Sequence, residues 1–283
     1  MKVKVKVDMS KLDKNIKLQN LHTHTTYCDG KDSVEEMIIA AYNMGFDSIG
    51  FSSHSFMKGR SLPKKIIENY KLEIADLKMK YAGKIDVFCG LECEMCGNTN
   101  LSGFDYLIGA VHYLKCEEEL FTFDLGNVED VKQVINRYFD GDGMAYVKTY
   151  YRDLAKLPQT GKFDIIAHFD LITKFNEKGQ LFDENAKEYR WAAIEAAEQL
   201  SEKIPYFEVN TGAIAKGYRT SPYPSAFLLH ELKRLGFGAV ISSDCHDSKN
   251  LTCGLQDAEE LLKNCGFKEK YILTKNGFVP VEI

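Results

Sequence analysis

Two histidines stand one residue apart in the stretch NLHTHTTYCDG, which begins at Asn20. His22 and His24 follow an apolar segment and precede a turn, so on a strand their imidazoles leave the same face, about 6 to 7 Å apart at the backbone. At that spacing both rings can bind one metal ion. An isolated pair is about as often structural as metal-binding, so further ligands are needed before the pattern indicates a metal site.

Polar pairs with the same spacing close other segments of strand character. The pairs are Glu92 and Glu94, His168 and Asp170, Glu208 and Asn210, and Asp244 and His246. His54 and His112 end two more segments, so six of the seven histidines lie at expected strand ends. Buried imidazoles and carboxylates are costly without partners, and cations compensate a ring of them best. The ligands exceed the needs of one ion and suit zinc, manganese or iron, which predicts two or three divalent ions.

Segments of strand character alternate with amphipathic helical segments. Strands are expected at residues 18–24, 48–54, 87–94, 106–112, 165–170, 207–211 and 239–246. Helices are expected at residues 34–44, 63–83, 128–139, 144–157, 184–200, 225–235 and 256–265. Ser33 and Glu36 open the first helix in a capping-box arrangement. The alternation predicts a parallel sheet, open or closed into a barrel, whose strand ends would gather the polar residues at one mouth.

Composition and charge exclude several function classes. The 283 residues suit one α/β barrel, and the apolar fraction of 45% is ordinary for a globular protein. A net charge of −5 without a clustered basic stripe argues against a nucleic-acid partner. No apolar run reaches the length of about 18 residues that a membrane span needs. The first ten residues alternate charge and valine, which predicts a short strand and no secretory signal, so we expect a cytoplasmic protein.

The eight cysteines are expected to be reduced thiols, because disulfide frameworks belong to small secreted domains. Cys89, Cys93 and Cys96 have a spacing that would suit an iron–sulfur cluster. The strand expected here places Cys89, Leu91 and Cys93 on one face. Buried packing thiols are therefore the preferred interpretation.

In chain order the motifs HTHTTYCDG, FSSH, GLECE, GAVHYL, IAHFD and SSDCH resemble those of the PHP (polymerase and histidinol phosphatase) family. The chain most resembles the stand-alone histidinol-phosphate phosphatases of histidine biosynthesis, as indicated by the segments YCDGK, HFDLITKF and SPYPS. The resemblance implies a distorted, TIM-like (βα)7 barrel that spans residues 1–283 as one domain, with its metal centre at the C-terminal ends of the strands. Residues 116–151 form an insert between the fourth and fifth strands, where we expect two helices beside the mouth.

The resemblance also implies a ligand set for each of three ions. The first ion would take His22, His24, Glu92 and Asp244, the second Glu92, His112 and His168, and the third His54, His246 and Asp29. Many family members have a histidine at the position of Asp29. A carboxylate there is expected to weaken the third site or to favour a harder metal such as manganese.

The activity implied is hydrolysis of L-histidinol phosphate, a small phosphate monoester, to L-histidinol and phosphate. Hydrolysis of such esters needs acceleration of up to about 10²¹-fold, and a general base supplies only about 10² to 10⁴. Cations that activate water and neutralise the phosphoryl oxygens close much of that gap. We therefore expect direct attack by water, without a phosphorylated protein intermediate. Asp29, His246 and Asp244 are the catalytic candidates, and Asp29, His246 or a bound water would protonate the leaving group.

Basic residues after the strands are candidates for binding the substrate phosphate. They are Arg219, Lys216, Lys174 and Arg60. For each of them the alternative is a solvated surface charge. Glu94 and Asp170 are expected to orient ligating imidazoles or to contact the substrate amine, with structural hydrogen bonding as the alternative. Trp191 is expected to pack against the barrel wall.

Two other function classes stay open at this point. The chain could be another phosphoesterase on the same barrel, such as a nucleotide phosphatase or an exonuclease, although it lacks a basic groove. It could also be a metal-binding barrel that has lost catalysis, but such a relic should have gaps in its ligand set, and none is apparent beyond Asp29. Metal identity, occupancy of the third site, exact substrate and oligomeric state are not determined by the sequence.

Overall fold

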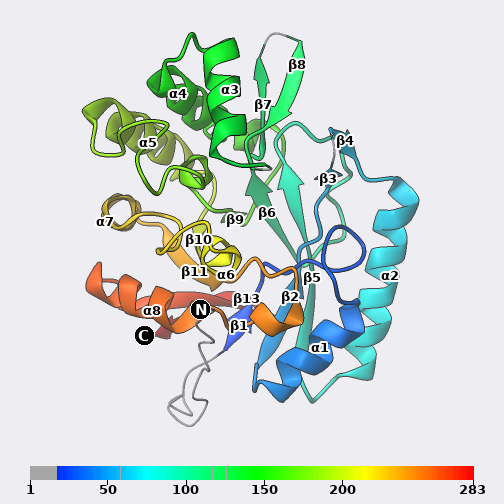
Figure 1. Ribbon diagram of the computed structural model, residues 1–283. Coiled ribbons are helices and arrows are strands. Elements are labelled where there is room, and N and C mark those ends of the chain that lie inside the picture. The colour runs from blue at the N-terminus through cyan, green and yellow to red at the C-terminus, as the bar shows by residue number, and fades with distance from the viewer. Residues whose placement is uncertain (1–17, 58, 117, 125) are drawn as a thin grey trace, which may run out of the picture.

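Seven parallel strands form the centre of the computed structural model, which describes residues 18–283 apart from 58, 117 and 125 and the side chain of residue 60 (Figure 1). In sheet order they are β1 (Gln19–Asn20), β2 (Ser48–Phe51), β5 (Asp86–Glu94), β6 (Tyr106–Ala110), β9 (Ile165–Ile166), β10 (Tyr206–Asn210) and β11 (Gly238–Ser242). A parallel bridge between Thr23 and Cys245 joins the chain after the first strand to the chain after the last. The nearly closed sheet confirms the predicted (βα)7 barrel and its strands. The strand predicted for the first ten residues lies outside the described residues.

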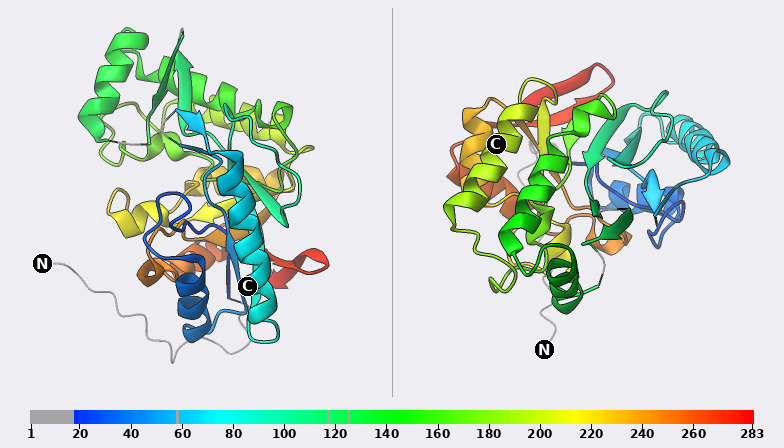
Figure 2. Two further views of the ribbon diagram at one scale, coloured as in Figure 1. Left: turned by 90° about the vertical axis from the view of Figure 1, so that its right-hand side faces the viewer. Right: turned by 90° about the horizontal axis from the view of Figure 1, so that it is seen from above.

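Helices cover the outside of this sheet (Figures 1 and 2). They are α1 (Val34–Asn43), α2 (Lys64–Lys80), α3 (Val128–Tyr138), α4 (Gly143–Leu154), α5 (Lys187–Leu200), α6 (Gly212–Lys216), α7 (Ala226–Arg234) and α8 (Leu255–Asn264). All but α6 were predicted, and α6 is too short for a periodic signal. The predicted capping box is present, because Ser33 Oγ accepts from the Glu36 N–H and the Glu36 carboxylate accepts from the Ser33 N–H.

Antiparallel hairpins extend the barrel beyond the prediction. They pair β3 (Phe56–Met57) with β4 (Arg60–Ser61), β7 (Tyr113–Cys116) with β8 (Glu119–Thr122), and β12 (Glu269–Thr274) with β13 (Gly277–Glu282). The β7–β8 hairpin, α3 and α4 occupy the excursion between β6 and β9, in the upper part of Figure 1. The two helices expected in this insert are present, and the hairpin precedes them. That residues 1–283 form one domain stays a prediction.

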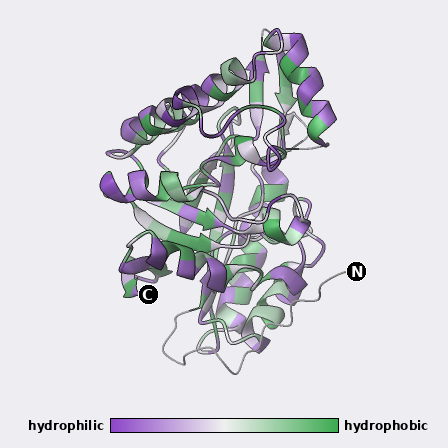
Figure 3. Cartoon of the chain, turned by 60° about the vertical axis from the view of Figure 1, so that its left-hand side comes forward, coloured by the Kyte–Doolittle hydropathy of each residue, from purple (hydrophilic) through white to green (hydrophobic). Residues whose placement is uncertain are grey.

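Apolar side chains fill both sides of the sheet. The larger cluster lies between strands and helices and includes Met37, Ile74 and Leu229. A smaller cluster, which includes Phe88, Ile108 and Val240, draws its members from strands throughout the sheet and fills the barrel. Figure 3 accordingly shows hydrophobic strands inside helices that carry hydrophilic residues. Strands buried on both faces are typical of parallel sheets covered by helices.

Trp191 contradicts the prediction that it packs against the barrel wall, because its side chain is 67% exposed. The buried stripe of α5 includes Tyr189, Ala193 and Leu200, and position 191 lies on the other side of the helix. Within the described residues, no helix has the length and apolar character needed to cross a membrane.

Tyr106 stands inside the barrel and fixes the spacing of neighbouring strands. Its hydroxyl donates to the carbonyl oxygens of Leu21 and Phe51. A Cβ added to Gly50 would lie 2.4 Å from Tyr106 Oη, and one added to Gly90 would lie 2.3 Å from Tyr106 Cζ. Glycine at these two strand positions therefore leaves the space that the ring occupies.

We expect the substitution Gly90→Ala to lower the free energy of unfolding by about 1 to 3 kcal/mol, because the new methyl group must displace a buried ring. Urea denaturation followed by circular dichroism measures this loss. In a Tyr106→Leu background the ring is gone, so the same substitution should cost less. An equal cost in both backgrounds would contradict the role assigned to the ring.

Candidate metal centre

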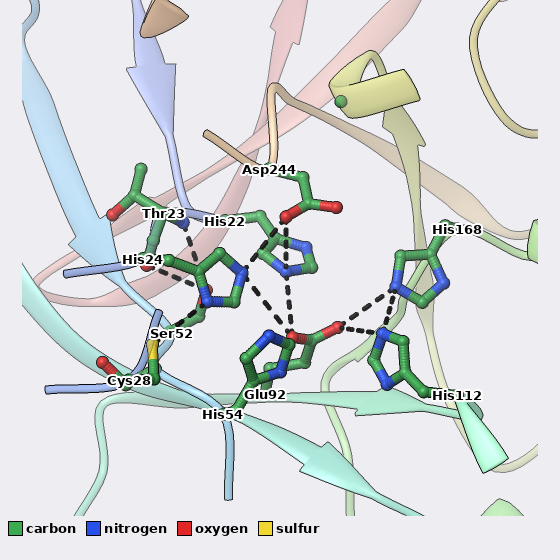
Figure 4. A network of polar contacts seen from close by, with 12 residues as sticks. His22, Thr23, His24, Cys28, Ser52, His54, Glu92, His112, His168 and Asp244 are labelled. Carbon is green, nitrogen blue, oxygen red and sulfur yellow. Dashed lines mark hydrogen bonds and ion pairs between the residues drawn. The ribbon is translucent and has the colours of Figure 1, made fainter. Parts of the chain in front are cut away.

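The residues predicted to bind metal meet at the carboxyl ends of the strands, and all of them except Asp29 and His246 are labelled in Figure 4. They come from β5 and from the segments that follow β1, β2, β6, β9 and β11, and they are His22, His24, Asp29, His54, Glu92, His112, His168, Asp244 and His246. Every one of these residues lies within ion-pair distance of another member of the set. The structure therefore brings together all nine side chains, from positions more than 200 residues apart.

Glu92 occupies the middle of the cluster, and its side chain is 1% exposed. Its Oε2 lies 2.7 Å from His54 Nδ1, 3.4 Å from His22 Nε2 and 3.6 Å from His24 Nε2. A buried carboxylate is costly unless charges or hydrogen bonds compensate it. Glu92 Oε2 nevertheless has no hydrogen-bond partner among the described residues.

The other oxygen of Glu92 faces two more imidazoles. Glu92 Oε1 lies 3.1 Å from His168 Nε2 and 3.2 Å from His112 Nε2, and these two nitrogens are 3.1 Å apart. Two ring N–H groups cannot point at one another, so at least one nitrogen presents a lone pair toward the cluster. A lone pair directed at a carboxylate and a second imidazole is an arrangement that a shared cation would stabilise.

Two further carboxylates complete the ring of ligands. Asp244 Oδ1 lies 3.1 Å from His24 Nε2 and 3.6 Å from His22 Nε2. Asp29 Oδ1 lies 3.3 Å from His246 Nε2, and the Asp29 side chain is 43% exposed. Asp29 is thus the most accessible member of the predicted set, at the edge of the cluster.

The ligand atoms form three groups that have the size of metal sites, with all atoms of a group within 4.8 Å of one another. The groups are His24, Asp29, His54 and His246; His22, His24 and Asp244; and His54, Glu92 and His112. Buried Nε2 atoms of His22 and His24 lack hydrogen-bond partners among the described residues. Buried polar atoms are nearly always paired. The two unpaired imidazole nitrogens, together with the surrounding imidazoles and carboxylates, therefore fit a site for divalent cations. The groups differ from the predicted sets in two ways. His24 also reaches the third site and His54 also reaches the second, whereas Glu92 is missing from the first group and His168 is in none of the three, although it lies 3.1 Å from Glu92 Oε1.

The electrostatics keep the carboxylates ionised. Burial raises the pKa of Glu92, but the surrounding imidazoles, His22 foremost, outweigh burial and hold that pKa well below its ordinary range. The same opposition holds the pKa of Asp244 well below its ordinary range. Burial, His246 and His54 lower the pKa of His24, so this imidazole stays neutral and can donate a lone pair. For His22, His54 and His112, nearby carboxylates outweigh burial and raise the pKa, so metal binding at these imidazoles would release protons. Ionised carboxylates and neutral imidazoles are the forms that bind metal ions.

Two glutamates contact the ring nitrogens of His112 and His22 that do not face Glu92. Glu94 Oε2 lies 3.0 Å from His112 Nδ1, which confirms the contact expected for Glu94. Glu208 lies 2.9 Å from His22 Nδ1 and accepts the backbone N–H of His168 at 2.8 Å. The sequence predicted that Glu208 lies at the end of a strand, two residues before Asn210, but it indicated no role for this side chain. Such contacts fix ring orientation and tautomer.

Asp170 does not orient an imidazole, contrary to one of the roles expected for it. Its Oδ2 accepts the backbone N–H of Ser225 at 2.9 Å, and burial raises the pKa of its carboxyl, although Arg219 opposes this. Asp170 therefore has the structural hydrogen bonding that we gave as the alternative.

A cavity of about 280 Å³ opens beside the metal centre. Among the predicted phosphate-binding residues, Lys174 and Lys216 line it. Arg219 does not; its guanidinium donates to the Thr173 carbonyl at 2.7 Å and lies 3.5 Å from Glu177. Arg60 lies in β4, and its side chain is outside the described part of the chain.

The cysteines take no part in the candidate metal groups of the described residues. Cys93 is buried and Cys89 half-buried on β5, as the packing interpretation predicted, whereas Cys96 is exposed. One thiol that the sequence did not single out reaches the site, because Cys28 Sγ lies 3.4 Å from His24 Nδ1. No sequence signal distinguishes Cys28 from the other thiols.

Comparisons with known proteins agree with this geometry. The family model described as the PHP domain matches residues 20–212. A probable histidinol-phosphatase of Deinococcus radiodurans is 26% identical over 87% of this chain and 92% of its own. A probable histidinol-phosphatase of Schizosaccharomyces pombe is 24% identical over 90% of this chain and 89% of its own.

The fold also matches a solved structure, the histidinol phosphate phosphatase of Lactococcus lactis complexed with zinc, L-histidinol and phosphate. The two chains superpose with a TM-score of 0.68 and 20% identity, over 93% of this chain and 99% of the other. At that identity the likeness shows the fold, whereas the family model covers more than half of the chain. The chain therefore belongs to the PHP domain family.

Proposed function

We propose that this protein is a metal-dependent phosphomonoesterase that hydrolyses L-histidinol phosphate to L-histidinol and phosphate, a step of histidine biosynthesis. The observation that carries the proposal is the cluster of nine imidazole and carboxylate side chains at the strand ends, at a cavity that two lysines also line. The substrate follows from the names of the two relatives, which align over nearly their full length, and from the ligands of the Lactococcus lactis structure. The complete ligand set speaks against a barrel that has lost catalysis.

We propose two or three divalent ions, of zinc, manganese or iron, held by the nine residues of the cluster. Glu92 would help to hold more than one of these ions, because its two oxygens face different imidazoles. When bound, such ions activate water and neutralise the charge that develops on the phosphoryl oxygens. The protein's part is to fix the positions of these ligands, which Glu94 and Glu208 do for His112 and His22.

Side chains that line the cavity would bind the ester and move its protons. Burial lowers the pKa of Lys216, but Asp244, Asp124 and Asp29 outweigh burial and raise it, so this ammonium is charged at neutral pH and can hold a phosphate oxygen. Despite burial, His246, His54 and His24 hold the pKa of Asp29 well below its ordinary range, so Asp29 is ionised and has no proton to give. His246 Nε2 lies 3.3 Å from Asp29 Oδ1 and is itself a proposed ligand, so we propose that a bound water beside these two side chains protonates the leaving alkoxide. Lys174 is paired with Asp124, and Arg219 lies outside the lining, so we give Lys216 the larger role in phosphate binding.

Metal removal tests the proposal directly. Gently purified protein should carry at least two equivalents of zinc, manganese or iron by elemental analysis. A chelator should abolish hydrolysis of L-histidinol phosphate and lower the melting temperature, because the buried carboxylates lose the cations that compensate them. Re-addition of the ion should restore both properties. Full activity of the chelated protein would contradict a metal-dependent reaction.

The carboxylate at position 29 should influence which metal is retained. We expect Asp29→His to shift metal content several-fold from manganese toward zinc when both are offered at equal concentration, because an imidazole is a softer ligand. Elemental analysis after dialysis measures the ratio. The control is Asp86→His at the opposite end of β5, which should leave the ratio unchanged. An identical ratio in all three proteins would rule out Asp29 as a ligand.

Glu208 should act through His22. Glu208→Gln replaces a carboxylate that accepts hydrogen bonds with an amide, which no longer supports the ring of His22 in the same way. We therefore expect metal affinity to fall by about 10- to 100-fold with the fold preserved. Competition against a chromophoric chelator measures the affinity. Glu118→Gln is the matched control, because the Glu118 side chain is 95% exposed. Wild-type affinity in Glu208→Gln would show that the carboxylate does not support the ligand.

A further inference from the structure

Part of the cavity lining belongs to none of the three candidate metal groups. It includes Asp124, Lys174, Lys216, Tyr218 and Tyr223. Asp124 is the only carboxylate in the described lining that lies outside those groups. An acidic side chain in a cavity built to receive a phosphate dianion is electrostatically unfavourable for phosphate alone. A ligand that also carries a positive charge would be compatible with it.

Asp124 follows β8 and precedes α3, so the excursion between β6 and β9 delivers it to the cavity. Lys174 Nζ donates to its Oδ1 and to its carbonyl oxygen, each at 2.6 Å. These bonds fix the position of the side chain, of which 26% remains exposed. Burial raises the pKa of Asp124, but Lys174 and His112 outweigh burial and lower it, so the carboxylate is ionised at neutral pH. The exposed part of this anion is available to a ligand.

Tyr223 adds a second polar group at the same cavity. Its side chain is buried, and its hydroxyl has no hydrogen-bond partner among the described residues. The backbone of Tyr223 is fixed by paired hydrogen bonds with Asn210, and its ring lies 6.5 Å from the ring of His168. A phenolic oxygen held in place without a partner can accept a hydrogen bond from a bound ligand.

The charges around the cavity explain why such acceptors matter. Lys216 and the proposed metal ions would make the cavity positive near the metal centre, whereas the charge of Lys174 is paired with Asp124. That field attracts the phosphate of a substrate and repels an ammonium group on the same molecule. An anion among the lining residues offsets the repulsion, and a charge-assisted hydrogen bond to it adds attraction. A substrate without an amine gains nothing from Asp124.

We propose that Asp124 is the specificity-determining residue of this cavity, binding the ammonium group of an amine-bearing phosphate monoester together with the Tyr223 hydroxyl. This assignment rests on the proposed function, because it requires that the phosphate of the same molecule is held at the metal centre. It goes beyond that function in naming the residues that distinguish amino alcohol phosphates from other phosphate monoesters.

The test compares two esters that differ by one group, L-histidinol phosphate and its des-amino analogue, 3-(imidazol-4-yl)propyl phosphate. The wild-type, metal-loaded protein should have the higher kcat/KM on the amine. Asp124→Asn keeps the shape of the side chain and an oxygen for Lys174, but removes the charge. We expect it to reduce the ratio of the two kcat/KM values by about 10- to 100-fold, with the des-amino ester little affected. Glu118→Gln, in the same insert, should leave the ratio unchanged.

Tyr223→Phe provides a second variant that does not depend on the pair between Asp124 and Lys174. It removes a hydroxyl that bonds to no described residue, so folding should be unaffected, and we expect a several-fold loss confined to the amine. Equal losses on both esters in Asp124→Asn would overturn the assignment, because Asp124 would then have only the structural role of pairing with Lys174. A wild-type protein that hydrolyses both esters equally would overturn it while the phosphomonoesterase proposal survives. Failure of the metal-loaded wild type on both esters would overturn the proposed function and the assignment with it.

Discussion

The structure depends on one buried anion, the carboxylate of Glu92. It lies at the end of β5 with its side chain 1% exposed, and five imidazoles from four other strand ends face its two oxygens. Burying a carboxylate costs several kcal/mol after relaxation of the surroundings. Despite burial, nearby carboxylates raise the pKa of His22, His54 and His112, so positive charge on these imidazoles offsets the cost, and bound metal cations would supply that charge in their place. The need for positive charge at Glu92 therefore connects the arrangement of the barrel mouth to its chemistry.

The barrel meets this constraint by geometry that is set far from the metal centre. Parallel strands deliver their carboxyl ends to one mouth, and the bridge between Thr23 and Cys245 brings the ligands of the first and last strands together. The ring of Tyr106 keeps the spacing of neighbouring strands inside the barrel. At the mouth, Glu94 and Glu208 contact the Nδ1 atoms of His112 and His22 and so orient these two rings. These contacts set the positions and ring orientations of the ligating side chains.

Much of this site was predictable because its signal is local. Side chains two residues apart on a strand point to the same face, so a pair such as His22 and His24 predicts both the strand and the face that carries its ligands. Glu208 carried the same signal, but nothing local indicates which imidazole it holds. Among the described residues, the periodic pattern also located every barrel strand and all α-helices except the short α6.

Contacts made by loops were beyond such reasoning, because tertiary packing sets them. Arg219 was expected at the phosphate, but three described acids or carbonyls engage its side chain outside the cavity. Asp124 was not singled out at all, since its role depends on how the insert folds back over the mouth. Trp191 was misplaced because one apolar residue in an amphipathic helix does not fix the helix's rotation.

Anomalous X-ray diffraction from crystals of gently purified protein, recorded above and below the absorption edges of zinc, iron and manganese, would locate any metal ions around Glu92. We expect at least two anomalous peaks in the cluster, one of them about 2.0 to 2.2 Å from a carboxylate oxygen of Glu92 and from imidazole nitrogens. A well-ordered cluster with no anomalous peak near Glu92 would contradict it.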